Sequence, residues 1–290
     1  MAAARQVGPI RRAVVAAGGF GTRLLPATRA VPKVLLPVVD RPLLQYALDE
    51  LAAAGFDEAA VLARADQHAI RDQLHTPEPL RQHLLRRGGS RVREVLEPAP
   101  GIRTQLVATS SEERGLGGQL AELADFVAGE PFALLFADEL CDPAVSPWDG
   151  MRETFARLNG VVAAAWGADP LPDEWRVGGY QPLDDAPDAD PWGAAPVPGR
   201  ARLIGRYLCP PQVVGLLERM AARRGFPLGI NDLLAALAEM GALSARRYTG
   251  RWWDCGSRAG YLSAVLTLAL EHEALGPRLA PALGAVEARP

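Results

Sequence analysis

The stretch "AAGGFGTRLLPATRAVPKVLLPVVDRP", residues 16–42, follows the short run "RAVV" and decides the fold that we expect. Its three glycines, Gly18, Gly19 and Gly21, lie where a buried strand over residues 11–17 would end. Glycines at such a position let the backbone approach a ligand closely and present N–H groups to phosphate oxygens. Because ligands of open α/β sheets bind beyond the carboxyl ends of the strands, the stretch predicts a phosphate-binding loop. A tight turn without a ligand is the alternative.

Lys33 is the only lysine in the chain, although lysine and arginine together number 31. We attribute the excess of arginine to a GC-rich genome, and this bias makes the surviving lysine informative. Lysine carries a compact point charge on a thin stem, whereas arginine carries a broad planar fork. We therefore predict that Lys33 enters a tight phosphate pocket together with Arg23. Chance retention of a surface lysine is the alternative.

The composition excludes several classes of protein. With 290 residues, a net charge of −3 and 49% hydrophobic residues, the chain has a globular composition. It shows no basic excess that would favour nucleic-acid binding. It also lacks a run of the about 18 apolar residues that a membrane span requires. Three widely spaced cysteines without a CxxC pair indicate reduced thiols in a cytoplasmic protein, rather than a disulfide framework or a structural zinc site.

The first half of the chain alternates between strand and helix patterns, which predicts a parallel α/β sheet with right-handed connections. The expected strands cover residues 11–17, 58–63, 92–97, 104–109 and 131–137. The expected helices cover residues 42–54, 66–74 and 117–128. Residues 76–90 hold prolines and many arginines, so we expect a mobile, solvated insertion there.

The second half contains a long segment rich in Pro, Asp and Gly, residues 167–200, which predicts a loop or lid. The remaining expected strands cover residues 160–166, 201–209 and 245–250. The remaining expected helices cover residues 210–225, 230–241 and 259–272. The tail over residues 277–290 has little to hold it in place, so we expect it to be loose.

The stretch that begins at residue 16 and runs to residue 51 resembles the signature of the sugar-1-phosphate nucleotidyltransferases, in the form found in bacterial UTP–glucose-1-phosphate uridylyltransferases. Further segments resemble family motifs in the expected order: "RGLGGQL" (114–120), "PFALLFADEL" (131–140), "RVGGY" (176–180), "LIGRY" (203–207) and "WDCGSRAGYLSAV" (253–265). The resemblance extends to about residue 272. It implies a mixed, mainly parallel Rossmann-like sheet flanked by helices.

The resemblance also implies an activity and an organisation. A nucleoside triphosphate, with UTP expected first, and a sugar 1-phosphate would yield a nucleotide sugar and pyrophosphate with the help of Mg²⁺. One domain would cover residues 1–276, with a nucleotide-binding half at about 8–140 and a sugar-phosphate half at about 141–276. No nucleic-acid or membrane partner is implied. A homo-oligomer is possible, and the helical region 211–272 is where we would expect its interface.

The family pattern assigns roles to individual residues. Lys33 and Arg23 would bind the nucleotide phosphates, and Asp138 and Asp254 would bind Mg²⁺, with Arg23, Lys33 and Asp138 as the catalytic set. Helix capping is the alternative role for each aspartate. The expected nucleotide-binding residues are Ala17, Gly18, Gly19, Gly21, Thr22, Arg23, Ser110 and Gly117. The expected sugar-phosphate-binding residues are Gly178, Asp190, Arg200 and Arg202.

The chain departs from the family in the sugar-phosphate half. The segment "DAPDADPWGAAPVPGR", residues 185–200, stands where the family carries a VEKP motif. Asp190 could replace the glutamate of that motif, but Pro191 occupies the place of its lysine, so the lost charge would have to come from Arg200 or Arg202. The residue matching the family's base-reading glutamine falls near Ser110, which leaves the base open. Either the acceptor differs from glucose 1-phosphate, as a modified sugar or cyclitol phosphate would, or the chain binds nucleotides without turnover.

Overall fold

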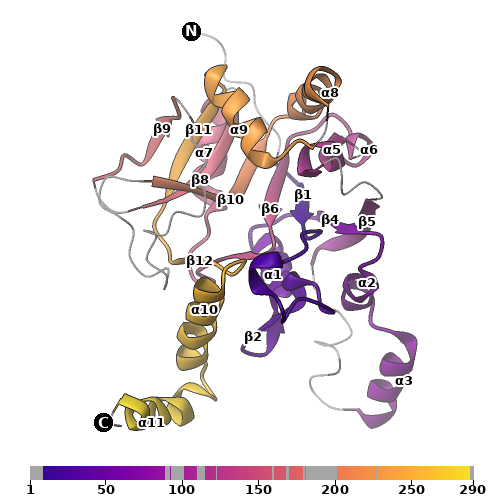
Figure 1. The fold of residues 1–290 in the computed structure, drawn as a ribbon, viewed down its shortest axis with the longest axis vertical. Helices are drawn as coiled ribbons and strands as arrows, with labels where there is room; N and C mark the ends of the chain where they lie inside the picture. Colours follow the sequence, from indigo (N-terminus) through magenta and orange to yellow (C-terminus); the bar gives the residue numbers. More distant parts are fainter. Residues whose placement is uncertain are drawn as a thin grey trace.

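The computed structural model describes residues 9–88, 92, 101–109, 115–121, 123–158, 160–167, 170–178, 180, 201–225 and 227–287. Eight strands form one sheet in the order β5-β4-β1-β6-β10-β8-β11-β9 (Figure 1). The first half of the chain builds a parallel part of this sheet, in which β1 lies between β4 and β6. Antiparallel β10 joins that part to the second half, where β8 and β11 are again parallel to each other. The expected mixed, mainly parallel sheet is confirmed.

All strands of the main sheet except β9 agree closely with the sequence patterns. Their bounds are β1 (Arg12–Ala16), β4 (Glu58–Arg64), β5 (Arg103–Thr109), β6 (Phe132–Phe136), β8 (Val161–Gly167), β9 (Glu174–Arg176), β10 (Ala201–Cys209) and β11 (Leu243–Tyr248). In β1, Ala13 and Val15 belong to the core on one face of the sheet, and Val14 belongs to the core on the other. This period of two explains why a strand buried on both faces appears as a continuous apolar run in the sequence.

Helices cover both faces of the sheet. On one face lie α1 (Leu43–Ala53), α2 (His68–Leu74) and α7 (Trp148–Arg157). On the other face lie α5 (Gly115–Ala121), α6 (Ala124–Val127), α8 (Gln212–Arg224) and α9 (Ile230–Glu239). In α1 the buried residues at helical spacing are Leu43, Leu44, Ala47, Leu48 and Leu51, and all but Leu43 belong to the core on this face of the sheet.

Two small sheets lie near the carboxyl edge of the main sheet. In one, β2 (Pro37–Val38) pairs with β3 (Arg41–Pro42). In the other, β7 (Glu139–Cys141) pairs antiparallel with β12 (Trp252–Asp254), which places Asp254 opposite Glu139. Helix α10 (Arg258–Glu271) starts just beyond β12, and the Ser257 hydroxyl caps it by accepting a hydrogen bond from the Gly260 N–H at 3.1 Å.

Several expectations need correction. The expected insertion over 76–90 contains a helix, α3 (Glu78–Arg87), none of whose residues is buried. The helix can form because the prolines fall at its start, where proline is tolerated. The single helix expected over 117–128 is two helices, α5 and α6. The expected loop 167–200 contains β9, which is held by pairing with β11. The expected loose tail is helical over α11 (Gly276–Glu287), which contacts α10.

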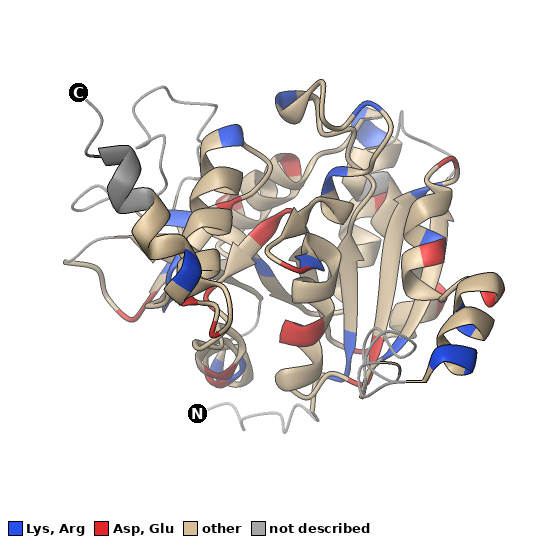
Figure 2. Ribbon diagram, turned by 90° about the horizontal axis from the view of Figure 1, so that it is seen from below, with Lys and Arg blue, Asp and Glu red and all other residues tan. Residues whose placement is uncertain are grey.

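Some expected features lie outside the described residues. These are nearly all of the strand expected at 92–97 and the part of the expected loop that covers residues 181–200. Within the described ranges, no helix has the length and apolar character to cross a bilayer. Acidic and basic residues are interspersed along the elements in Figure 2, in keeping with a net charge of −3.

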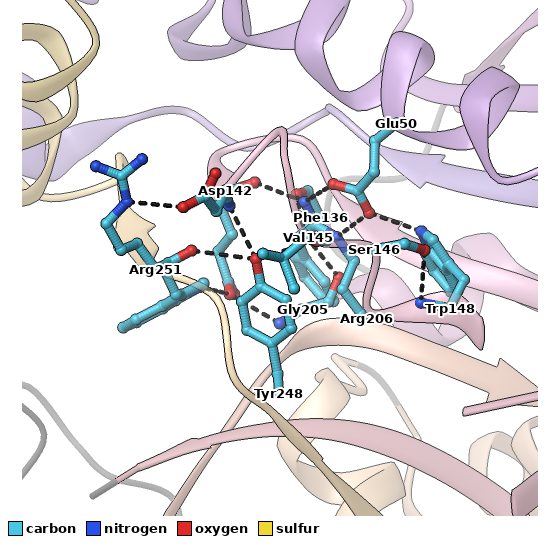
Figure 3. A network of polar contacts seen from close by, with 12 residues as sticks. Glu50, Phe136, Asp142, Val145, Ser146, Trp148, Gly205, Arg206, Tyr248 and Arg251 are labelled. Carbon is cyan, nitrogen blue, oxygen red and sulfur yellow. Dashed lines mark hydrogen bonds and ion pairs between the residues drawn. The ribbon is translucent and has the colours of Figure 1, made fainter. Parts of the chain in front are cut away.

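A buried ion pair joins several elements beneath the carboxyl edge of the sheet (Figure 3). The guanidinium of Arg206 on β10 is fully buried and donates to both carboxylate oxygens of Glu50 on α1, at 2.8 and 2.7 Å. It also donates to the carbonyls of Phe136 and Glu139 at 3.3 and 3.0 Å. Glu50 in turn accepts a hydrogen bond from the Trp148 indole at 2.7 Å. Every charge in this network therefore has a partner, which a buried ion pair requires.

We expect Glu50→Ala to destabilise the protein by about 3–5 kcal/mol, because it leaves the buried Arg206 charge without a counter-ion. Urea denaturation followed by circular dichroism measures the change. Asp57→Ala is the matched control, since it removes the carboxylate of an exposed pair, Arg11–Asp57 at 2.8 Å, and should cost at most about 1 kcal/mol. Equal losses in the two variants would contradict the structural role of the buried pair.

Candidate active site

The loop after β1 is shaped around the Lys33 side chain. A Cβ at Gly19 would lie 3.0 Å from Lys33 Cε and 3.1 Å from its Nζ, so any larger residue would push the end of the lysine side chain aside. Gly21 has a left-handed backbone with φ of 68°, and a Cβ at that residue would lie 3.0 Å from Lys33 Cβ. Left-handed backbone favours glycine. The glycines of the loop therefore leave space for the Lys33 side chain close to the backbone, in addition to exposing backbone N–H groups.

Asp138 lies opposite this loop because β1 and β6 are parallel neighbours. Ala16 pairs with Phe136, so both strands end at the same edge and their following residues meet there. Asp138 is 7% exposed, and its Oδ2 forms an ion pair with Lys33 Nζ. Both side chains are largely shielded from solvent, which strengthens their attraction relative to a surface pair.

Asp254 reaches the same place from the C-terminal part of the chain. The pairing of β12 with β7 sets it beside the turn that follows β6. Arg23, in the 3₁₀ helix η1 (Thr22–Leu24), donates to the two Asp254 oxygens at 3.0 and 3.4 Å. The two predicted cations and the two predicted acids therefore lie together, each cation against one carboxylate.

Gly256 lies where these groups converge. A Cβ at this residue would lie 2.7 Å from an Arg23 nitrogen, 2.8 Å from Asp138 Oδ2 and 3.0 Å from Asp254 Oδ1. Both carboxylate oxygens thus lie within 3.0 Å of one point. Two such hard oxygen donors suit Mg²⁺, which commonly takes one or two protein carboxylates and completes its shell with water and substrate phosphate. Groups of three or more acidic, His or Cys ligands do not occur in the described part of the chain.

Two cavities open at this point. The larger has a volume of about 1170 Å³, somewhat above the roughly 300–1,000 Å³ of most small-molecule sites. Its lining includes Arg23, Lys33, Asp138, Glu139, Trp175, Tyr180, Arg202, Tyr207, Asn231, Trp252 and Asp254. The smaller has a volume of about 250 Å³ and is lined by Ala16, Gly18, Gly19, Phe20, Lys33, Arg64, Leu116, Gln119, Phe136 and Asp138. The two share Lys33, Phe136 and Asp138.

The predicted nucleotide-binding residues lie around the smaller cavity to different degrees. Gly18 and Gly19 line it. The Ala17 N–H is instead used by the sheet, since it donates to the Leu62 carbonyl at 2.9 Å. Gly21 and Thr22 shape the turn and line neither cavity. Ser110 lies outside the described residues. Gly117 lies in α5, and two other residues of this helix, Leu116 and Gln119, line the cavity.

Of the predicted sugar-phosphate-binding residues, some line the larger cavity and others do not or lie outside the described residues. Arg202 lines the larger cavity. Gly178 is exposed and does not line it, whereas its neighbours Val177 and Tyr180 do. Asp190 and Arg200 lie outside the described residues.

Glu139 was not among the residues predicted from the sequence, although it directly follows Asp138. Its Oε2 accepts hydrogen bonds from the Gly205 N–H at 2.7 Å and from the Trp252 indole at 2.8 Å. Burial raises the pKa of the Glu139 carboxyl to about 7, while the Gly205 hydrogen bond acts in the opposite direction. These contacts fix a carboxyl group in the wall of the larger cavity. A polar residue at the end of a buried strand was the signal that could have identified it.

Arg64 and Phe20, which line the smaller cavity, were also not predicted from the sequence. The guanidinium carbon of Arg64, at the end of β4, lies 4.2 Å from the centroid of the Phe20 ring, and Arg64 donates to the Gly18 carbonyl at 3.1 Å. This contact links the end of β4 to the glycine loop. The position of Arg64 at the carboxyl end of a parallel strand was the available signal.

Comparison with known proteins places the chain in a family. Residues 12–156 match the family model described as nucleotidyl transferase, and the chain belongs to this family. A UTP–glucose-1-phosphate uridylyltransferase of Bacillus subtilis is 28% identical over 283 residues, which cover 94% of this chain and 95% of that protein. A uridylyltransferase of Staphylococcus saprophyticus is 26% identical, over 91% of this chain and 94% of its own length.

Solved structures show the same fold. A UDP-glucose pyrophosphorylase from Acinetobacter baumannii superposes with a TM-score of 0.80 at 24% identity, covering 96% of this chain and 100% of that one. A UTP-bound form from the same organism gives a TM-score of 0.75 at 24% identity, covering 97% of this chain and 100% of that one.

We expect Gly256→Ala to weaken binding of UTP with Mg²⁺ at least about tenfold, because the new methyl group displaces charged side chains that meet there. Isothermal titration calorimetry measures the binding. Gly215→Ala in α8 is the matched control; its Cβ would lie 3.4 Å from an Arg219 nitrogen, and the helix should gain about 0.5–1 kcal/mol. Unchanged binding in the Gly256 variant would show that the convergence of these side chains does not matter for the nucleotide.

Proposed function

We propose that the protein transfers a nucleotidyl group from a nucleoside triphosphate, with UTP as the first candidate, to a sugar 1-phosphate, releasing pyrophosphate. The acceptor would be glucose 1-phosphate or a related sugar or cyclitol phosphate. The observation that carries this proposal is the meeting of the two cavities at Lys33 and Asp138. The names of the similar uridylyltransferases and of the UTP-bound structural neighbour support the choice of UTP.

The arrangement of the cavities suits a reaction between two phosphates. The smaller cavity begins at the glycine loop and would hold the nucleotide, and the larger cavity would hold the sugar. Lys33 lines both, so its ammonium group would stand beside the phosphoryl group that passes from one substrate to the other. Such a group stabilises the negative charge that develops on the transferred phosphate.

The reaction requires no protein nucleophile. An oxygen of the sugar 1-phosphate is already anionic at neutral pH; it attacks the α-phosphorus, a new P–O bond forms, and the bond to pyrophosphate breaks. The protein holds the two substrates in line and balances their charge, with Arg23 and Lys33 as the cations nearest the shared part of the cavities. Asp138 and Asp254 would hold Mg²⁺, which neutralises and orients phosphate oxygens when it is bound.

The ion pairs of the site must open when substrates bind. Lys33 contacts Asp138 and Arg23 contacts Asp254 in the structure. Phosphates would take the two cations as partners, and the carboxylates would then be available to Mg²⁺. This exchange keeps each charged group paired before and after binding, which limits the cost of desolvation.

We expect Lys33→Arg to lower turnover by about 100-fold or more, a loss much greater than the accompanying loss of folding stability. The broad guanidinium does not fit over Gly19, where the lysine stem passes at close range. Pyrophosphate release and urea denaturation measure the two quantities. Arg29→Lys, at an exposed residue of the same loop, is the converse control and should leave turnover unchanged. Equal turnover in Lys33→Arg would refute the requirement for a compact charge.

We expect Asp138→Asn to abolish Mg²⁺-dependent pyrophosphate release, because the amide cannot supply a negatively charged oxygen to the cation. A Mg²⁺ titration of activity measures the effect. Asp72→Asn, at an exposed residue of α2, is the control for the same chemical change and should titrate as the unmodified protein does. Activity that persists at ordinary Mg²⁺ concentrations would place the metal on other residues.

The experiment that tests the proposed function is pyrophosphate release with Mg²⁺, in which UTP, dTTP, GTP, ATP and CTP are each combined with glucose 1-phosphate and with a panel of other sugar and cyclitol phosphates. Release with one pair identifies the reaction and both substrates. If no pair gives release while nucleotide binding is measurable, the proposed activity is wrong, and the result would favour a nucleotide-binding regulator instead.

A further inference from the structure

The larger cavity contains three cationic side chains among its described lining residues: Arg23, Lys33 and Arg202. Arg23 is paired with Asp254, and Lys33 with Asp138. Arg202 has no carboxylate partner within ion-pair distance in the parts of the chain that the structure describes; its contact there is with an aromatic ring. A cation that faces a cavity without a counter-ion favours an anionic ligand, because the ligand then supplies the missing partner.

The Arg202 guanidinium is held in place by stacking. Its central carbon lies 5.0 Å from the centroid of the Trp252 ring. Trp166 packs against the same indole, with ring centroids 5.6 Å apart. Arg202 and Trp166 are direct cross-strand partners in the pairing of β10 with β8. A guanidinium fixed on an aromatic face loses little further freedom when it binds a ligand, and it keeps its planar edge for hydrogen bonding.

Trp252 connects Arg202 to the acidic part of the site. The face of its indole carries Arg202, and its Nε1 donates to Glu139 at 2.8 Å. Trp252 also begins β12, the strand that ends at Asp254. Arg202 therefore lies in the same cavity wall as Glu139 and is joined through Trp252 to the strand that carries Asp254.

Polar groups for the rest of an acceptor lie in the same cavity. Tyr180 donates from its hydroxyl to Asn231 Oδ1 at 2.8 Å, and both residues line the cavity. Glu139 offers a carboxyl group held by two hydrogen bonds. Hydroxyl groups of a sugar find donors and acceptors here, whereas Arg202 is the group suited to an anion.

We propose that Arg202, stacked on Trp252, binds the phosphate of the acceptor sugar and so replaces the lysine that Pro191 has displaced from the family pattern. This assignment rests on the proposed function. The planar edge of the guanidinium offers two parallel N–H groups to two phosphate oxygens, a geometry that lysine cannot reproduce. Arg202 is thus a substrate-binding residue that selects acceptors carrying a phosphate.

The test compares Arg202→Met, Arg202→Lys and the unmodified protein, with Arg176→Met as the matched control. Arg176 is exposed on β9 and does not line the larger cavity, so its loss removes the same charge elsewhere. Steady-state pyrophosphate release gives KM for the sugar 1-phosphate and KM for the nucleotide separately. Calorimetry with glucose 1-phosphate and with glucose measures binding independently of turnover.

We expect Arg202→Met to raise the acceptor KM about 10- to 100-fold, the usual effect of a lost hydrogen bond to a charged group, and to leave the nucleotide KM within about twofold. Arg202→Lys should restore only part of the loss, and Arg176→Met should behave as the unmodified protein does. An unchanged acceptor KM in Arg202→Met, with normal turnover, would overturn the role of Arg202 while the proposed function stands.

The binding experiment separates the two proposals. If no substrate pair gives turnover, the proposed function fails, and calorimetry then decides the role of Arg202. Loss of glucose 1-phosphate binding in Arg202→Met but not in Arg176→Met would support the assignment. Equal binding of glucose 1-phosphate by the two variants, or no binding of any sugar or cyclitol phosphate of the panel by the unmodified protein, would overturn it.

Discussion

The geometry of the site depends on one buried cation, Arg206. Its guanidinium donates to the carbonyls of Phe136 and Glu139, the residues on either side of the turn that carries Asp138. Its charge is balanced by Glu50 on α1. A turn with both flanking carbonyls held by the same rigid fork has little freedom to move. Asp138 and Glu139 are therefore presented at fixed positions before any ligand arrives, which is the preorganisation that electrostatic catalysis requires.

Three segments far apart in the sequence meet at this turn. The glycine loop arrives because β1 pairs with β6 in parallel, and Asp254 arrives because β12 pairs with β7. Their convergence is close enough that Gly256 has no room for a side chain between them. Here Lys33 contacts Asp138 and Arg23 contacts Asp254, so each of these two cations is balanced by one carboxylate. Under the proposed function, substrate phosphates would compete with these carboxylates for the cations, and a ligand that brings a divalent cation would ease this competition.

The sequence predicted the parts of the site that depend on local pattern. An apolar strand ending in glycines, a lone lysine and an acid at the end of a buried strand indicated the glycine loop, Lys33 and Asp138, which lie together because parallel strands end at one edge. The position of Asp254 depends on the pairing of two three-residue strands, β7 and β12, which no periodicity reveals, so only the family resemblance indicated it. Trp175 was missed because its short strand lies in a segment with the composition of a loop. The helix α3 was missed because prolines and many arginines indicated a solvated insertion, and α11 was missed because nothing in the sequence indicated what would hold the tail.

Lys33 and Arg202 show why a chain with 31 basic residues keeps one lysine. A Cβ atom added at Gly19 would lie only 3.0 Å from Lys33 Cε, so the lysine stem runs close to this glycine, in a space that suits a methylene chain and a compact ammonium group. The Arg202 guanidinium lies on the Trp252 ring, where a flat and weakly hydrated cation stacks and an ammonium group would lose most of the contact. Each site thus selects its cation by shape as well as by charge. A bias toward arginine in the genome can then replace lysine at every position where either side chain fits, while Lys33, which lies close to Gly19, remains lysine.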